Sequence, residues 1–160
     1  MQAIKVIVSF IAFYFLAIFQ ASYLSHFKIR GGAWNTLLVA VILVNFFEKK
    51  EDKSGLIIGA LAGFYLDLFS PYFMGIFTLV GVLIAFAVKR AKPLFDPKRF
   101  ASFAVIFFSA LLFYEIIFMF ISAGQGLFFN ISGLIINFLA GIIIYWMVRL
   151  FNVISKAKIR

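Results

Sequence analysis

The chain has 160 residues, of which 65% are hydrophobic and 13% charged, and it contains 24 phenylalanines. A soluble domain is about 45–50% apolar and about 25% charged, and a small one keeps a large exposed surface. The composition therefore excludes a soluble globular domain, a disordered chain and a coiled coil. It predicts an integral membrane protein.

The reactive residues are few. The sequence has no cysteine and a single histidine, His26, which excludes disulfide scaffolds, thiolate metal sites and His-rich metal centres. It also contains no phosphate-binding glycine loop, zinc-protease motif or serine-hydrolase elbow. We therefore expect a protein that is not an enzyme, with no catalytic residue, metal site or cofactor.

The net charge of +9 does not indicate nucleic acid as a partner. The basic residues lie between apolar runs and form no face with interleaved aromatic residues. Basic residues in such positions are typical of the cytoplasmic loops of membrane proteins, where they face the lipid surface.

Six apolar stretches predict an all-α, polytopic membrane protein. A helix needs about 20 apolar residues to cross the hydrocarbon core. The third and fourth stretches form one run that is broken at Pro71, which cannot continue a helix and forces Ser70 into an extended conformation. We therefore expect a tight turn there and a single transmembrane domain over residues 1–160, with spans at about 6–25, 34–47, 54–69, 73–88, 100–122 and 127–148.

The basic residues predict the orientation of these spans. With six spans and a cytoplasmic N-terminus, 13 of the 15 basic residues lie inside, and only Lys28 and Arg30 lie outside. A five-span chain would put the basic segment 89–99 and the basic C-terminal tail on different sides. The positive-inside rule therefore favours six spans with both termini cytoplasmic.

Glycines form a stripe on the third predicted span. Gly55, Gly59 and Gly63 recur every four residues, and Asp67 continues the series on the same helix face. Glycine lets another helix backbone approach closely, which promotes helix association in lipid. Two interpretations stay open for this stripe: packing within the bundle, or a docking face for a partner helix. A weaker stripe on the last span contains Gly133, Asn137 and Gly141.

Two carboxylates lie within the predicted spans. A charged residue at the centre of a membrane helix costs about 2.5–3.5 kcal/mol. At about 1.5 Å per residue, Asp67, Glu115 and Gln20 all lie roughly 20 Å from the inner surface. The outer half of the bundle thus collects polar residues, and we expect the inner half to be nearly free of them. Either the carboxylates are near the interface, solvated or protonated, or they line a polar pocket or partner site open to the outside.

Asp67 comes just before the Ser70–Pro71 break. The first backbone N–H groups of the next helix have no partner within that helix and carry partial positive charge. Asp67 can accept hydrogen bonds from these groups. The alternative is an ion pair with Lys28, with Arg30 or with a basic group of a partner.

The same region resembles a known family. The run GALAGFYLDLFS at residues 59–70, followed by Gly75, resembles the core signature of MreD, the rod-shape-determining membrane protein. Residues 19–22 are similar to a step in the first helix of that family. Trp34–Asn35 stands where the family often has Pro-Asp, and Asn35 can still cap the second helix.

The resemblance implies a non-enzymatic subunit of the bacterial cell-wall elongation complex in the cytoplasmic membrane. Such a subunit binds an MreC-like one-span protein and, through it, wall-synthesis enzymes and the actin-like filament. The family is also similar in fold to the substrate-binding membrane components of vitamin transporters. The alternative function is therefore a subunit for small-molecule uptake. The candidate residues for partner binding or structure are Gln20, Gly55, Gly59, Gly63, Asp67, Gly75, Glu115 and Asn137.

Overall fold

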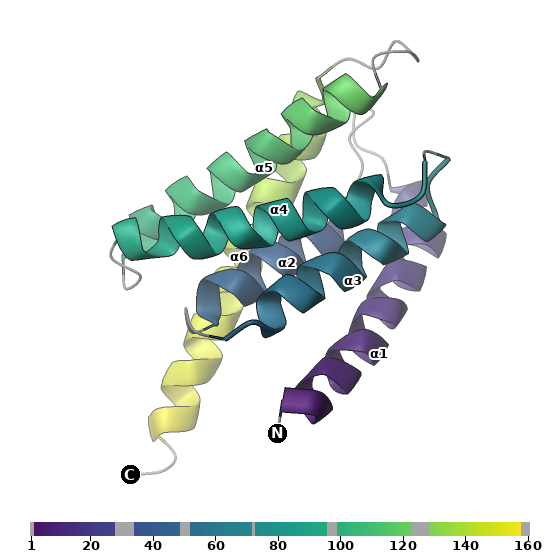
Figure 1. The fold of residues 1–160 in the computed structure, drawn as a ribbon. Coiled ribbons are helices and arrows are strands. Elements are labelled where there is room, and N and C mark those ends of the chain that lie inside the picture. The colour runs from purple at the N-terminus through teal and green to yellow at the C-terminus, as the bar shows by residue number, and fades with distance from the viewer. Residues whose placement is uncertain are drawn as a thin grey trace.

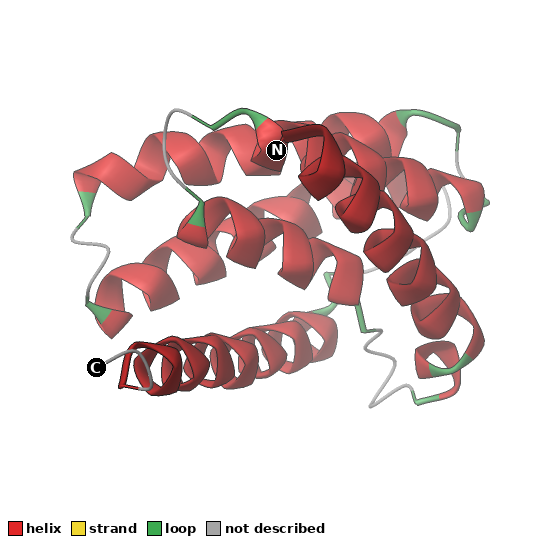
Figure 2. Ribbon diagram, turned by 90° about the horizontal axis from the view of Figure 1, so that it is seen from below, coloured by secondary structure: helices red, strands yellow, loops and turns green. Residues whose placement is uncertain are grey.

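The structure, a computed structural model, describes residues 2–27, 34–48, 52–71, 73–95, 99–122 and 129–157. All regular structure in these ranges is helical (Figures 1 and 2). Its α-helices are α1 (Gln2–Ser22), α2 (Thr36–Phe47), α3 (Ser54–Leu68), α4 (Ile76–Ala91), α5 (Phe100–Ser122) and α6 (Ile131–Ala157). Short 3-10 helices follow α1 and α4: η1 (Leu24–His26) and η2 (Lys92–Leu94). Each predicted apolar stretch forms one α-helix, so the all-helical fold is confirmed.

The connection between α3 and α4 differs from the predicted tight turn. It extends from Phe69 to Gly75, and α4 begins at Ile76 rather than near residue 73. Gly75 is the N-cap of α4 and has a φ of +100°, a left-handed conformation that glycine adopts without steric cost. The helix therefore begins only after Gly75.

Three helical segments of the described chain are long and apolar enough to cross a membrane: Ile7–His26, Phe100–Ile121 and Ile131–Phe151. Helices α2 and α3 are apolar but have only 12 and 15 residues. They extend about 18 and 22 Å, against a hydrocarbon core of about 30 Å. The six-span topology thus stays a prediction.

Helix α2 lies at the centre of the bundle. It contacts each of the other five α-helices, and eight of its 12 residues are buried. Asn35 is the N-cap of α2 and Glu48 its C-cap, and Asn45 is a buried polar residue within the helix. In Figure 1, α1 begins and α6 ends at the same lower end of the bundle.

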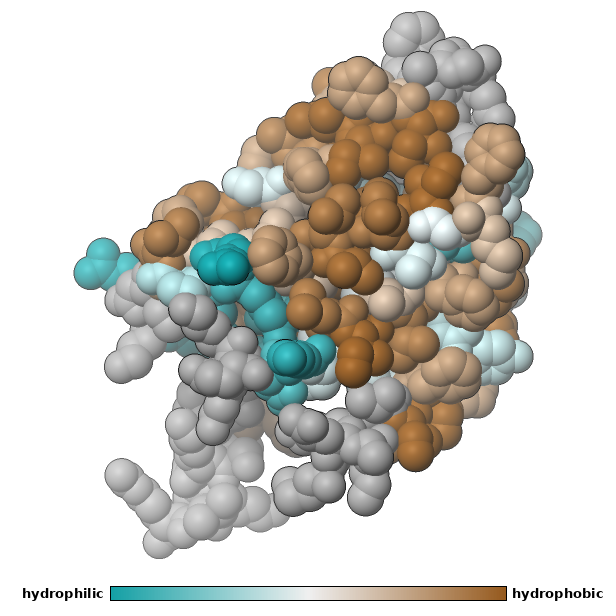
Figure 3. Space-filling view, viewed as in Figure 1, coloured by the Kyte–Doolittle hydropathy of each residue, from teal (hydrophilic) through white to brown (hydrophobic). Residues whose placement is uncertain are grey.

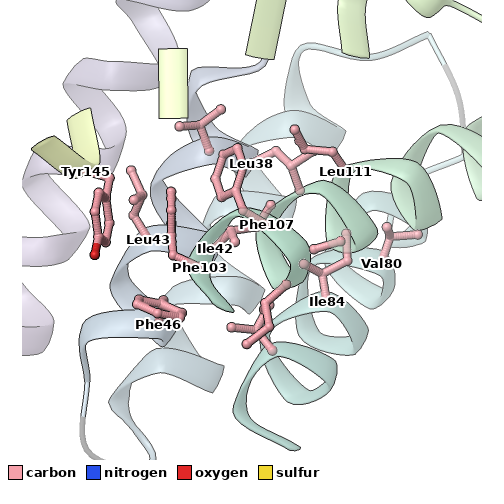
Figure 4. Close-up of a cluster of buried hydrophobic side chains, with 14 residues drawn as sticks. Leu38, Ile42, Leu43, Phe46, Val80, Ile84, Phe103, Phe107, Leu111 and Tyr145 are labelled. Carbon is pink, nitrogen blue, oxygen red and sulfur yellow. The ribbon is translucent and has the colours of Figure 1, made fainter. Parts of the chain in front are cut away.

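Apolar side chains fill the core and also cover the surface. Figure 4 shows the larger core cluster, in which side chains of α2, α4, α5 and α6 meet and the rings of Phe103 and Tyr145 stack with centroids 4.1 Å apart. The visible face is mostly hydrophobic as well, with a hydrophilic patch toward the lower left (Figure 3). Leu79, for example, is 63% exposed and Phe151 is 75% exposed. An apolar exterior of this kind suits a lipid environment.

Helices α3 and α4 share the most extensive contact of any helix pair in the described chain, and glycines lie in it. A Cβ atom on Gly59 would lie 2.7 Å from the carbonyl oxygen of Gly81, and one on Gly63 would overlap the backbone of Phe77 and Thr78. Both glycines therefore face α4 of the same chain. Of the two interpretations of the stripe, packing within the bundle is the correct one for these two positions.

We predict that Gly63→Leu destabilises the protein by about 1–3 kcal/mol or more, because the added atoms overlap the α4 backbone. The control is Phe64→Leu, at a neighbouring position that is 39% exposed. Thermal unfolding in detergent measures both variants. Equal melting temperatures for Gly63→Leu and the wild type would contradict the close α3–α4 contact.

Candidate functional site

Asp67, in the last turn of α3, caps the first turn of α4. Its Oδ1 accepts a hydrogen bond from the Phe77 N–H at 2.9 Å. Its Oδ2 accepts from the Thr78 N–H at 3.0 Å and from the Thr78 hydroxyl at 2.6 Å. Asp67 is only 4% exposed. The predicted capping role is thus confirmed, and Lys28 and Arg30, the alternative partners, lie outside the described residues.

Two amide side chains bind the start of α2 to its neighbours. Gln20 of α1 accepts hydrogen bonds at its Oε1 from the Thr36 hydroxyl at 2.8 Å and from the Leu37 N–H at 3.1 Å. Asn137 of α6 accepts at its Oδ1 from the Asn35 N–H at 2.8 Å. Asn35 itself caps α2 by accepting from the Leu38 N–H, as the sequence predicts. These residues hold α1 and α6 against α2 at one end of the bundle.

The weaker glycine stripe on α6 packs inside the bundle. Asn137 donates to the Gly133 carbonyl at 2.8 Å, and a Cβ atom on Gly141 would overlap the Phe107 ring of α5. This stripe therefore joins α6 to α2 and α5.

A second set of polar residues lies at the opposite end of α2, and we call it the α2–α4 polar cluster. It consists of Asn45, Glu48, Ser54, Gly55 and Lys89. Glu48 forms an ion pair with Lys89 at 2.6 Å and accepts from the Gly55 N–H at 2.8 Å and from the Ser54 hydroxyl. Asn45, fully buried, donates from Nδ2 to the Gly55 carbonyl at 3.1 Å. A Cβ atom on Gly55 would overlap Asn45 and Glu48. Gly55 therefore serves this cluster and not the α3–α4 contact.

This cluster overturns one expectation. The half of the bundle expected to be nearly free of polar groups contains a fully buried amide and an ion pair whose side chains are 10% and 12% exposed. The sequence places Lys89 in a basic segment that is typical of the cytoplasmic side, and it indicates no specific role for Asn45 or Glu48. One feature of the sequence does indicate a polar contact at this end of α2, because Asn45 interrupts an apolar run shortly before Glu48.

A pocket of about 460 Å³ opens where α2 begins, and we call it the α2 N-terminal pocket. All six α-helices or their adjoining turns contribute to its wall. Gln20, Glu115 and Asn137 line it together, as do Trp34 and Tyr114, which the sequence analysis missed. The expectation that polar residues gather at one end is therefore confirmed for these three candidates. Asp67 caps α4 beside the pocket, and its neighbours Leu66 and Phe69 are part of the wall.

A second, apolar concavity has a volume of about 810 Å³ and is here called the α1–α6 groove. Its floor is α2, with Ala40 and Val44 among the residues exposed to it. Val8 and Ser9 of α1 line one wall, and α6 lines the other. In Figure 1 the start of α1 and the end of α6 lie apart from each other at this end of the bundle. The groove is laterally open to the lipid phase if the long helices cross the membrane.

No group of three or more His, Cys, Asp or Glu side chains that could hold a metal ion occurs among the described residues. The candidate residues separate into three sets. Gly59, Gly63, Asp67 and Gly75 build the α3–α4 hairpin, Gly55 serves the polar cluster, and the other three line the pocket.

Comparison with known proteins gives no relative: the sequence matches no protein-family model, no curated protein and no solved structure.

We predict that Asp67→Ala lowers both abundance and unfolding temperature, since each buried donor left without its acceptor costs about 1–3 kcal/mol. Asp67→Asn keeps one acceptor oxygen and should be intermediate. The control is Glu115→Ala, because no described residue bonds to Glu115. Wild-type stability for Asp67→Ala would reject the capping role.

We also predict that Glu48→Ala and Lys89→Ala each destabilise the protein by about 3–5 kcal/mol, since each variant leaves an unpaired buried charge. The double variant Glu48→Gln/Lys89→Met should recover a large part of that loss, because it removes both charges. Arg90→Ala, at an exposed neighbouring position, is the control. Chemical unfolding of all four variants measures these losses, and a double variant that loses as much stability as the two single variants together would show that the pair does not matter.

Proposed function

We propose that the chain is a non-enzymatic, multi-pass subunit of the bacterial cell-wall elongation complex. In this proposal it lies in the cytoplasmic membrane and binds the single transmembrane helix of an MreC-like protein in the α1–α6 groove. Through that partner it helps to organise the wall-synthesis enzymes and the actin-like filament.

The residues that resemble the MreD signature, 59–70 and Gly75, support this proposal because they lie together in α3 and at the start of α4. Gly59 and Gly63 permit the close α3–α4 contact, Asp67 caps α4, and Gly75 supplies the left-handed residue before it. The signature residues therefore act together on one hairpin.

The α1–α6 groove is the observation that carries the partner assignment. At about 810 Å³ it is larger than the α2 N-terminal pocket of about 460 Å³, and it is lined mainly by apolar side chains. Ser9 and Ala40 are small and let a second helix approach closely, which promotes helix association in lipid. The floor runs along α2, whose 12 residues extend about 18 Å, so a partner helix would be covered over more than half of the hydrocarbon core.

The proposal includes six spans with both termini on the cytoplasmic side. It is supported by the distribution of basic residues, and by the position of the start of α1 and the end of α6 at one end of the bundle (Figure 1). That end also holds Lys89 and Lys92, which contact Glu48 through its side chain and its carbonyl oxygen. The short helices α2, α3 and α4 would then cross a locally thinned bilayer with little tilt.

A second candidate is a substrate-binding membrane subunit of a small-molecule transporter. The α2 N-terminal pocket favours it, since its volume of about 460 Å³ lies within the range of about 300–1,000 Å³ found for ligand sites.

Capture of the partner tests the first proposal. We predict that Ala40→Phe and Val44→Trp fill the groove and abolish co-purification of a co-expressed MreC-like one-span protein, without lowering the abundance of the chain itself. Leu79→Phe, on α4 and 63% exposed, is the control and should keep the partner.

Two results would contradict the assignment. One is that both groove variants co-purify with the MreC-like protein as well as the wild type does. The other is an equal loss of capture for Leu79→Phe, because the contact would then not be specific to the groove.

A further inference from the structure

The α2 N-terminal pocket contains a carboxylate with no partner in the described chain. Glu115 lies in the middle of α5, between apolar residues, and lines the pocket. No hydrogen bond or ion pair to it occurs within the described ranges. Asp67, by contrast, accepts three hydrogen bonds. A carboxylate in a membrane helix is costly, and one without a structural partner indicates a functional contact.

Two amide groups in the wall of the same pocket have unused donors. The Oε1 of Gln20 and the Oδ1 of Asn35 accept hydrogen bonds from the first turn of α2. Their Nε2 and Nδ2 groups donate to no described residue, and both side chains line the pocket. The pocket thus offers a ligand one carboxylate acceptor and two N–H donor groups.

Aromatic rings form much of the remaining wall. Phe77, Tyr114 and Phe118 lie against one another, with ring centroids 6.0 to 6.5 Å apart. Trp34 lines the pocket at the start of α2. Aromatic faces attract cations and accommodate flat apolar groups.

We propose that the α2 N-terminal pocket binds a small organic molecule that carries a protonated amine. Its ammonium group lies against Glu115, its apolar part against the aromatic wall, and a second polar group accepts from Gln20 or Asn35. The combination of a carboxylate and aromatic faces selects cations and disfavours organic acids. This inference does not rest on the MreC-like partner, and it gives the ligand class of the transporter subunit if the second candidate function holds.

The experiment uses the fluorescence of Trp34 in the purified full-length protein. The chain has two tryptophans, and Trp146, on α6, does not line the pocket, so Trp146→Phe leaves Trp34 as the single reporter. Two amines of different shape serve as probes: phenethylamine and cyclohexylmethylamine. The neutral 2-phenylethanol and the anionic 3-phenylpropionate match phenethylamine in shape but lack the ammonium group.

We expect saturable binding of at least one amine and markedly weaker binding of the alcohol and the acid. Glu115→Gln should weaken amine binding about tenfold or more, as expected when a charge-assisted contact is lost, and should leave the unfolding temperature unchanged. Asp52→Asn, at the opposite end of the bundle, is the matched control and should bind as the wild type does.

Three outcomes would overturn the proposal. The first is that neither amine binds, the second is that the alcohol binds as tightly as phenethylamine, and the third is that Glu115→Gln binds the amine as tightly as the wild type does. The second outcome would mean that the pocket takes apolar molecules such as lipid chains. Because no partner protein is present, failure here leaves the capture test of the α1–α6 groove unaffected, and the converse also holds.

Discussion

The contact between the Asp67 carboxylate and the first turn of α4 joins two helices at the middle of the chain. Helices α3 and α4 are joined by residues 69–75 and pack through glycine. The glycine contacts allow the two helix backbones to approach closely. The three hydrogen bonds to Asp67 join the end of α3 to the first turn of α4 and so help to fix the register of the two helices. Because Leu66, Phe69 and Phe77 line the α2 N-terminal pocket, the same contact also shapes the pocket wall.

A short central helix creates a second constraint. Helix α2 has 12 residues, so both of its ends lie where backbone groups have little water to bind if the bundle is in a membrane. Side chains satisfy these groups instead. Asn35 and Gln20 accept from the N–H groups of Leu38 and Leu37, and Lys92 donates to the Glu48 carbonyl at 2.5 Å. The pocket and the α2–α4 polar cluster thus arise from one requirement at the two ends of α2.

Much of this arrangement follows from local sequence patterns. Apolar runs predict the helices, and four-residue spacing predicts the glycine face. The Asp67 cap follows from a carboxylate just before a helix break. Other features depend on residues far apart in the sequence. The pairing of Glu48 with Lys89 joins the end of α2 to the end of α4, and nothing near Lys89 distinguishes it from a cytoplasmic basic residue. Gly55 has the same spacing as Gly59, yet it faces Asn45, because α2 and not α4 is its neighbour there.

Amide hydrogen exchange at the start of α4 tests the central contact most directly. The structure predicts that the N–H groups of Phe77 and Thr78, which bond to Asp67, exchange slowly in the wild type. In Asp67→Ala they should exchange much faster, while the amide of Phe107, in the middle of α5, stays protected. Fast exchange of Phe77 and Thr78 in the wild type, or exchange that Asp67→Ala leaves unchanged, would contradict the account.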